Sequence, residues 1–415
     1  MILLKVEYVF DSDTIIFEFE FEDGEPKDSS SKMVKQNFSI KLPNINSLDE
    51  IHNDHLALSS FLVIRPWLKE KIQFGKPVSK RFADSLRKFN LKITPIDDDL
   101  TSYENESGKY AALAFSGGAD STAALSVLPS TTIPIFLNRP ITRSTRYKKE
   151  AALHACNTIS KAGFDCWIID CDLELLRDPV GFPTDLSNGV PAILLSQKLA
   201  IFTICYGTIL ESLYSLGRLK FKEYIQTSHW KMWWNVFESA GLPLSFPVGG
   251  ISEVGTEIIC SKSNLGILAQ SCIRGKVGKP CMNCWKCFRK TTVRNGLGIS
   301  EYNTRMMNRL IKTKEVKKKL ASLPVSHENV LLFSLSRLNL DALPPSFISR
   351  FENEFNLDYL QKWLPDSIEF VHPRIQLEVK KNISKFLEEM DYNEISLLKS
   401  WDNTKRIAGK QKLVL

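Results

Sequence analysis

The sequence predicts an α/β fold, in which a parallel sheet carries helices on both faces and is flanked by two extensions. In the middle of the chain, short apolar runs alternate with amphipathic stretches, as in strands joined by helices. The first part of the chain alternates apolar and polar residues like antiparallel strands, and the last part carries basic stretches with helical spacing. We expect a β-hairpin-plus-helices extension over residues 1–105, an α/β domain over 106–298 and a helical region over 299–415.

The N-terminal extension is expected to begin with a β-hairpin. Residues 4–10 and 15–21 flank Asp11-Ser12-Asp13, which is typical of a turn. In the second run phenylalanines alternate with glutamates, which gives one buried and one solvated face. The remaining expected elements are a strand over residues 37–42, a helix over 56–69 with a break at Pro66, a helix over 79–89 and an acidic boundary segment over 95–109.

The α/β domain is expected to alternate strands and helices. Its strands are predicted at residues 111–115, 132–137, 166–171 and 223–227. Its helices are predicted at residues 122–127, 147–162, 192–216 and 230–240. Ligands of open parallel sheets bind at the carboxyl ends of the strands, so the segments that follow these four strands form the expected ligand side.

The segment after the first of these strands is a candidate phosphate site. It consists of Ser116-Gly117-Gly118-Ala119-Asp120-Ser121. Glycines let backbone N–H groups approach an anion, and the N-terminus of the following helix favours negative charge. The serine hydroxyls add donors, and Asp120 is expected to position a magnesium ion. The chain contains no Gly-Lys-Ser/Thr, which excludes the common lysine-bearing nucleotide loop.

A second cluster consists of thiols. Four of the nine cysteines are Cys272, Cys281, Cys284 and Cys287. Four thiolates at this spacing favour the closed tetrahedral site of a structural zinc ion. An iron–sulfur cluster is the alternative, because Cys-x2-Cys-x2-Cys also occurs in ferredoxin-like runs. Such runs usually continue to a fourth cysteine followed by proline, whereas here the fourth lies upstream and Phe288 follows.

Together these motifs resemble a known family. The segment 116–121 matches the Ser-Gly-Gly-x-Asp-Ser signature of the PP-loop ATP pyrophosphatases. The cysteines add the pattern Ser-Cys-x8-Cys-x2-Cys-x2-Cys. With both motifs, roughly residues 110–295 resemble 7-cyano-7-deazaguanine synthase of the queuosine pathway. The resemblance implies a HUP-like (adenine nucleotide α-hydrolase-like) domain. It implies a structural zinc on Cys272, Cys281, Cys284 and Cys287, and ATP phosphates on Ser116, Gly117, Gly118, Asp120 and Ser121.

The resemblance also implies an activity. Members of this family are ATP-dependent ligases that activate a carboxylate as an acyl-adenylate, release pyrophosphate, and form an amide and then a nitrile. The family lacks both extensions, and it often has Pro-x-Arg-Asn where this chain has Asn188-Gly189-Val190-Pro191-Ala192. The chain is similar in this to enlarged synthase-like proteins of bacterial anti-phage defence operons, where the same adenylation is expected to act on a protein or a nucleobase-like substrate.

Cations near the ligand side are further candidates. Arg143 and Arg146 follow the second predicted strand and are expected to bind the triphosphate, with solvated loop arginines as the alternative. Arg274, Lys276 and Lys279 lie between the zinc cysteines. We expect Lys276 to act in catalysis with Ser116 and Asp120, by stabilising the departing pyrophosphate.

Three other residues have two interpretations each. His229 is either a general base or, more commonly, a structural histidine. Glu253 and Glu257 either meet the substrate amine or begin a helix.

Composition limits the remaining classes. A content of 43% hydrophobic and 24% charged residues is typical of a globular protein, and a net charge of +7 does not require nucleic acid, which we leave open. The apolar stretch 192–214 contains too many polar residues to span a membrane, and no signal peptide is evident. Clustered thiols indicate a reducing compartment. We therefore expect a cytoplasmic protein.

The expected partners are ATP, magnesium, zinc, a carboxylate-bearing substrate and a protein bound through the two extensions. The family resemblance adds a homodimer. The alternatives to a ligase are a non-catalytic nucleotide- and zinc-binding scaffold and a tRNA-modifying PP-loop enzyme. The last would need a catalytic cysteine pair, whereas the clustered thiols are already assigned to metal.

Overall fold

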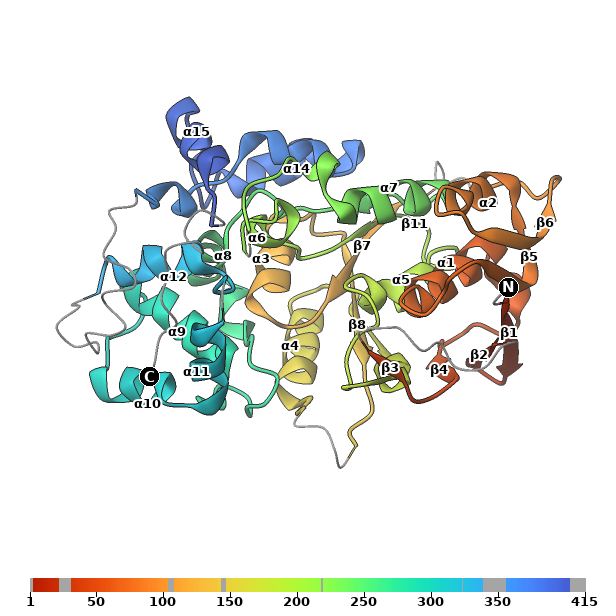
Figure 1. The fold of residues 1–415 in the computed structure, drawn as a ribbon, viewed down its shortest axis with the longest axis horizontal. Helices are drawn as coiled ribbons and strands as arrows, with labels where there is room; N and C mark the ends of the chain where they lie inside the picture. The colour runs from red at the N-terminus through yellow and green to blue at the C-terminus, as the bar shows by residue number, and fades with distance from the viewer. Residues whose placement is uncertain are drawn as a thin grey trace.

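The computed structural model describes residues 3–21, 31–103, 108–142, 147–217, 219–322, 324–338 and 356–403. Two five-stranded sheets form its framework. Figure 1 shows the N-terminal sheet at one end of an elongated molecule, the second sheet in the middle, and the helices α9 to α12 at the other end.

The N-terminal sheet has the strand order β4-β2-β1-β5-β6. Its strands are β1 (Leu3–Asp11), β2 (Thr14–Phe21), β4 (Asn37–Lys41), β5 (Lys71–Ser79) and β6 (Lys92–Asp97). The predicted hairpin is confirmed, since β1 and β2 pair antiparallel around Ser12 and Asp13. As expected, the phenylalanines of β2 are buried, and Phe17 stacks on Phe38 with ring centroids 4.5 Å apart.

The two predicted helices of the extension are present, but the strand between them and the strand after the second helix were missed. Helix α1 (Asn53–Ile64) ends just before Pro66, as expected, and α2 (Lys80–Arg87) follows β5 directly. The prediction of helices alone for residues 46–95 is wrong because β5 and β6 pair in parallel, and β5 pairs with β1. Gly75 and Pro77 interrupt the alternation in β5, and the pairing register with β6 shifts there, which obscures the period-two pattern.

The second sheet is parallel throughout and confirms the α/β class. Its strand order is β12-β11-β7-β8-β9, with β7 at its centre. Its strands are β7 (Tyr110–Phe115), β8 (Ile133–Asn138), β9 (Trp167–Asp170), β11 (Ile201–Cys205) and β12 (Leu244–Ser245). Successive residues of β7 enter two different apolar cores, with Ala112 and Ala114 in one and Leu113 and Phe115 in the other. Both faces of the sheet are therefore covered.

One predicted helix and one predicted strand of this domain are wrong. The expected helix over residues 192–216 contains strand β11, flanked by the short helices α5 (Val190–Leu194) and α6 (Leu210–Leu213). All five residues of β11 are buried, and an apolar run of that length fits a strand and a buried helix equally well. The expected strand over residues 223–227 is instead a 3-10 turn, Tyr224–Gln226. Strand β11 therefore takes the place in the sheet that this segment was expected to fill.

Apart from α5 and α6, the helices of the α/β domain are α3 (Ala119–Val127), α4 (Glu150–Lys161), α7 (Ser228–Ser239), α8 (Glu253–Lys262) and α9 (Trp285–Gly296). Beyond them lie α10 (Thr304–Ile311), α11 (Lys314–Ala321), α12 (Glu328–Leu335), α14 (Pro373–Ile383) and α15 (Tyr392–Ser400). A two-stranded pairing joins β3 (Lys32–Met33) to β10 (Arg177–Asp178).

The last helices return to the central sheet. Val379 and Ile383 of α14 lie in the same apolar core as Leu113 of β7 and Ala123 of α3. Within the described segments, no helix combines the length and apolarity that a membrane span requires.

Candidate functional site

The loop that joins β7 to α3 lies at the carboxyl end of the central strand. Gly117 there has φ +69°, a conformation that strongly favours glycine. A Cβ at this position would lie 3.1 Å from the Cβ of Ala155 on α4, so a side chain would also lack space. The backbone turn between Ser116 and α3 thus depends on this glycine.

Two serine hydroxyls meet at the N-terminus of α3. The Oγ atoms of Ser116 and Ser121 lie 3.0 Å apart, and Ser121 Oγ accepts the Ser116 N–H at 3.2 Å. Gly118 is the N-cap of α3, and its glycine backbone provides no side-chain cap. Apart from the Ala119 N–H, which donates to a side chain described below, the N-terminal end of α3 and its dipole are directed at the loop, where they favour an anion.

The segment before the thiol cluster contacts this loop directly. Ser271 Oγ accepts the N–H of Ala119 at 3.1 Å, and Gln270 N–H donates to the carbonyl of Gly117 at 2.9 Å. The two motifs that the sequence analysis treated separately thus form one site.

The four predicted metal ligands converge. The Sγ atoms of Cys272, Cys281, Cys284 and Cys287 all lie within 4.8 Å of one another, a set that could hold a metal ion such as zinc. Around a single ion with metal–sulfur bonds of about 2.3 Å, a tetrahedron places the sulfurs about 3.8 Å apart. Cys281 Sγ and Cys287 Sγ lie 3.8 Å apart. The N–H groups of Cys281 and Cys287 donate to the sulfurs of Cys272 and Cys284, which orients these two ligands.

Helix α9 begins at this thiol cluster and carries a lysine to the Ser-Gly-Gly loop. Lys290 Nζ lies 3.2 Å from a carboxylate oxygen of each of Asp120, Glu253 and Glu257. Burial alone would lower the pKa of Lys290, but the three carboxylates outweigh it and hold that pKa above its ordinary value. Lys290 therefore remains an ammonium ion.

A second cation, Arg289, pairs with one of the carboxylates that contact Lys290. Arg289 Nε lies 2.6 Å from Oε2 of Glu253, which is fully buried. Burial would raise the pKa of Glu253, but Arg289 and Lys290 hold it well below its ordinary value. The Glu253 N–H donates to Glu211 at 3.0 Å, and burial together with the charge of Glu253 raises the pKa of Glu211 to about 7. The network thus continues from the loop into the core.

Only one carboxylate oxygen of Asp120 has contacts within the described residues. Its Oδ1 accepts from Thr256 Oγ1 at 3.0 Å and from Lys290 at 3.2 Å. The Asp120 side chain keeps 35% of its surface exposed. Within the described residues its contacts all fall on Oδ1, which leaves Oδ2 for a ligand such as a magnesium ion.

A cavity of about 680 Å³ lies beside this network. Ser271, Glu257, Lys286, Lys290 and Arg294 are among the residues that line it. The volume is in the range of small-molecule sites. Three of these side chains are cations, which suits an anionic ligand. Ala119 and Asp120 of the loop contact two lining residues, Ser271 and Lys290, but no residue from Ser116 to Ser121 is among the lining residues.

Comparisons with known proteins add one similarity. A family described as a family of unknown function (DUF6395) matches residues 232–402. The matched segment contains α8, the thiol cluster and α9, but it begins after the Ser-Gly-Gly loop. No curated protein and no solved structure matches the chain.

The other predicted cations lie away from the loop or outside the described residues. Lys276 is exposed on a turn closed by the Lys279 N–H, and within the described residues it has no contact with Asp120. Arg274 Nη1 pairs with Glu315 of α11 at 2.5 Å instead of pointing at the loop. Arg143 and Arg146 lie outside the described residues.

His229 and the two glutamates have structural surroundings. His229 Nδ1 lies 2.8 Å from the hydroxyl of Tyr224, and its Nε2 lies 3.3 Å from Asp185. Glu253 and Glu257 both lie on α8 and face Lys290. Glu253 is the first residue of α8, as the helix-start interpretation expected, and both glutamates also hold a cation, which neither interpretation included.

Sequence reasoning missed Lys290 and Thr256. A signal was present, because Glu253 and Glu257 are four residues apart, as are Lys286 and Lys290, so each pair shares one helix face. The packing of α9 against α8 and α3 decides whether Lys286 or Lys290 contacts the glutamates. The spacing of the residues in the sequence cannot predict that packing.

Replacing Lys290 with methionine is expected to destabilise the protein. The substitution leaves Asp120, Glu253 and Glu257 without their shared cation, which costs about 3–5 kcal/mol of unfolding free energy. Urea denaturation followed by circular dichroism measures the loss. The matched control is Lys286→Met, one turn earlier on α9 and exposed, which changes stability by about 0.5 kcal/mol or less. Equal midpoints for Lys290→Met and the natural protein would contradict the described role of the network.

Proposed function

We propose that this protein is an ATP-dependent adenylating enzyme. It activates a carboxylate as an acyl-adenylate and releases pyrophosphate. The observation that carries the proposal is the loop after β7, where two serine hydroxyls 3.0 Å apart meet a helix N-terminus beside a half-exposed aspartate. The likeness of this loop to the PP-loop signature supports the same activity.

The loop can bind a triphosphate through its own donors. The hydroxyls of Ser116 and Ser121 lie within hydrogen-bond distance of each other, and Ser121 Oγ also donates to the Gly118 carbonyl at 3.1 Å. Phosphate oxygens can replace these acceptors without leaving a hydroxyl donor unpaired. The N-terminus of α3 adds N–H groups and a positive dipole end. Asp120 would hold magnesium through Oδ2, and bound magnesium would neutralise charge on the phosphates.

The reaction itself is a substitution at the α-phosphorus of ATP. A carboxylate oxygen of the substrate forms a bond to this phosphorus, and the bond to the bridging oxygen breaks. Pyrophosphate leaves with the electron pair. Lys290, fixed as an ammonium by three carboxylates, contributes preorganised positive charge next to the loop.

The neighbouring cavity supports a carboxylate-bearing substrate. Lys286, Lys290 and Arg294 contribute cationic walls, and the last two also contact carboxylates of the network. An anionic group that enters there would be held beside the phosphate loop. Lys290 and Ser271, which line the cavity and contact the loop, would bring the two reactants together.

The metal that we assign to the four cysteines is zinc. Sulfurs within 4.8 Å of one another suit a single ion, because a cluster holds its cysteines on different iron atoms and spreads them farther apart. The four ligands complete a closed tetrahedral sphere, so the ion has a structural role. It would fix both Ser271, next to Cys272, and α9, whose first turn contains Cys287.

One observation favours a second candidate. Lys290 already occupies Oδ1 of Asp120, and the loop residues do not line the neighbouring cavity. A non-catalytic scaffold that binds nucleotide and zinc would need no more than this. Such a scaffold binds ATP without turning it over.

The adenylation activity is tested with ATP labelled at the α-phosphate. The protein is incubated with magnesium and a cell extract that supplies carboxylates. The rate is measured as the label that appears in free AMP and in adenylated products. Ser116→Ala and Asp120→Asn are each expected to lower the rate by about 10²–10³-fold, because each removes a group aimed at the phosphates. Ser261→Ala, an exposed serine on α8, is the control and retains the rate. Full activity in both loop variants sinks the proposal, and nucleotide binding without any turnover favours the scaffold.

Metal analysis tests the zinc assignment. We expect about one zinc ion per chain from four thiolates. Cys284→Ser should lose most of this zinc and unfold at lower temperature, while Cys166→Ser, whose thiol lies outside the four-cysteine set, should keep it. Stoichiometric iron with visible absorbance would overturn the assignment.

A further inference from the structure

Helices α10 and α11 are amphipathic, with one face buried and the other cationic. Met307, Leu310 and Ile311 of α10 are buried in the same apolar core as Phe288 of α9. The exposed basic residues of the two helices are Arg305, Arg309, Lys312, Lys314, Lys318 and Lys319. Both helices therefore present a strongly basic outer surface.

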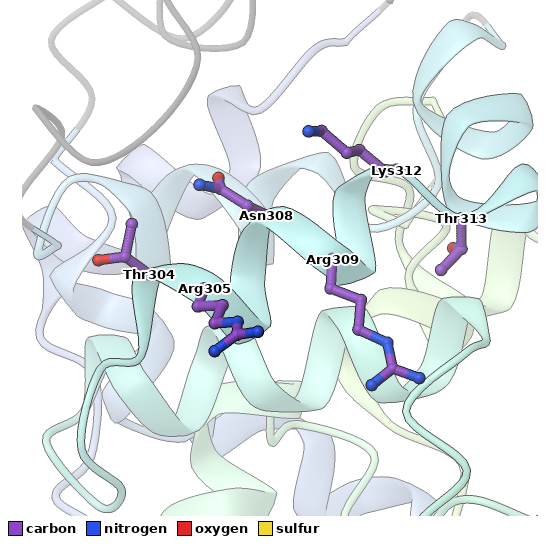
Figure 2. A pocket seen from close by; sticks show the side chains of 6 residues that line it. All are labelled: Thr304, Arg305, Asn308, Arg309, Lys312 and Thr313. Atoms are coloured by element: carbon purple, nitrogen blue, oxygen red, sulfur yellow. The ribbon is translucent and has the colours of Figure 1, made fainter.

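The outer side of α10 forms an open groove of about 700 Å³. Its lining consists of Thr304, Arg305, Asn308, Arg309, Lys312 and Thr313. Figure 2 shows the side chains of Arg305 and Arg309 extending to the same side of the helix, while Lys312 extends to the other. Every residue that lines the groove is cationic or an uncharged hydrogen-bonding residue, and none is acidic.

This segment is strongly cationic. Residues 304–321 contain seven lysines and arginines and one acid, Glu315, which gives a net charge of +6. Glu315 does not neutralise the surface, because it pairs with Arg274 at 2.5 Å and accepts the Trp285 N–H at 3.0 Å. The seven cations form no ion pair within the described part of the chain.

We infer that this surface, from Arg305 to Lys319, binds the phosphodiester backbone of a nucleic acid strand. Arginine forks match phosphate oxygens in geometry as well as charge. Thr304, Asn308 and Thr313 add the neutral hydrogen-bonding groups that proteins commonly direct at phosphates and sugars. Contacts of this kind give affinity without sequence preference.

The composition of the surface fits nucleic acid better than other anionic partners. A helix that lies on a membrane inserts large apolar side chains, but the apolar face of α10 and α11 is buried within the protein. The core of a protein interface is rich in aromatic residues and poor in lysine, whereas this surface has the opposite composition.

Glu315 also fixes the surface relative to the thiol cluster. Its two oxygens join α11 to Arg274, which lies between the metal ligands, and to the first residue of α9. A bound strand would therefore be held at a defined place beside the candidate site. The inference does not depend on the adenylation proposal, because none of the groove residues lies in the loop or the cavity.

The test measures binding of a short fluorescently labelled single-stranded RNA to the full chain by anisotropy. Arg305→Glu with Arg309→Glu is expected to weaken binding by about tenfold or more. It should also reduce the slope of log affinity against log salt by about 1.4, since each phosphate contact on a single strand contributes about 0.7. The milder pair Arg305→Gln with Arg309→Gln should weaken binding in the same direction, and unchanged thermal unfolding shows that each variant is folded.

The matched control is Lys381→Glu with Lys385→Glu. These lysines are also exposed and four residues apart, but they lie on and just after α14. The control is expected to bind the RNA within about twofold of the natural protein. The inference is overturned if neither RNA nor single-stranded or duplex DNA binds at low salt, if the control weakens binding equally, or if the arginine pair affects binding to phosphatidylserine vesicles alone. Formation of AMP should be the same in the natural protein and the groove variants, so this test and the adenylation test can fail separately.

Discussion

The contact on which the site depends is the one between Lys290 and Asp120, 3.2 Å apart. Asp120 lies in the first turn of α3, within the loop segment Ser116 to Ser121, and Lys290 lies on α9, whose first turn contains Cys287. Glu253 and Glu257 of α8 share the same ammonium group. One buried cation therefore connects the loop, the metal-binding segment and the helix between them. A buried charge with three partners is tolerated only when all the partners are in place, so this contact fixes how the three helices dock.

The thiol cluster acts on the loop from two directions. Before its first cysteine, Ser271 accepts the Ala119 N–H and Gln270 donates to Gly117. After its last cysteine, α9 delivers Lys290 to Asp120. A metal held by the four sulfurs would keep both segments in place together. Such a metal would shape the proposed phosphate site without contacting it, and the same segment anchors the basic helices through Glu315.

Features fixed by neighbouring residues could be predicted from the sequence. The β1–β2 hairpin, the Ser-Gly-Gly turn after β7 and the convergence of the four cysteines each depend on short-range spacing, and the structure contains all three. Strand β11 could not be distinguished from a helix because its five residues are all buried and have no periodic face. Lys290 could not be selected over Lys276, since both are basic residues near the cysteines. The docking of α9 decides between them, and it places Lys290 inside and leaves Lys276 exposed.

We propose that the loop from Ser116 to Ser121 binds the nucleotide and that α9 is coupled to it. Amide hydrogen exchange of the full chain, with and without magnesium and ATP, tests both parts of this proposal. ATP is expected to slow exchange in the loop and the first turn of α3, and also in α9 around Lys290, because Lys290 contacts Asp120 of the loop. Slowed exchange confined to other segments, or no change in either element at saturating ATP, would contradict it.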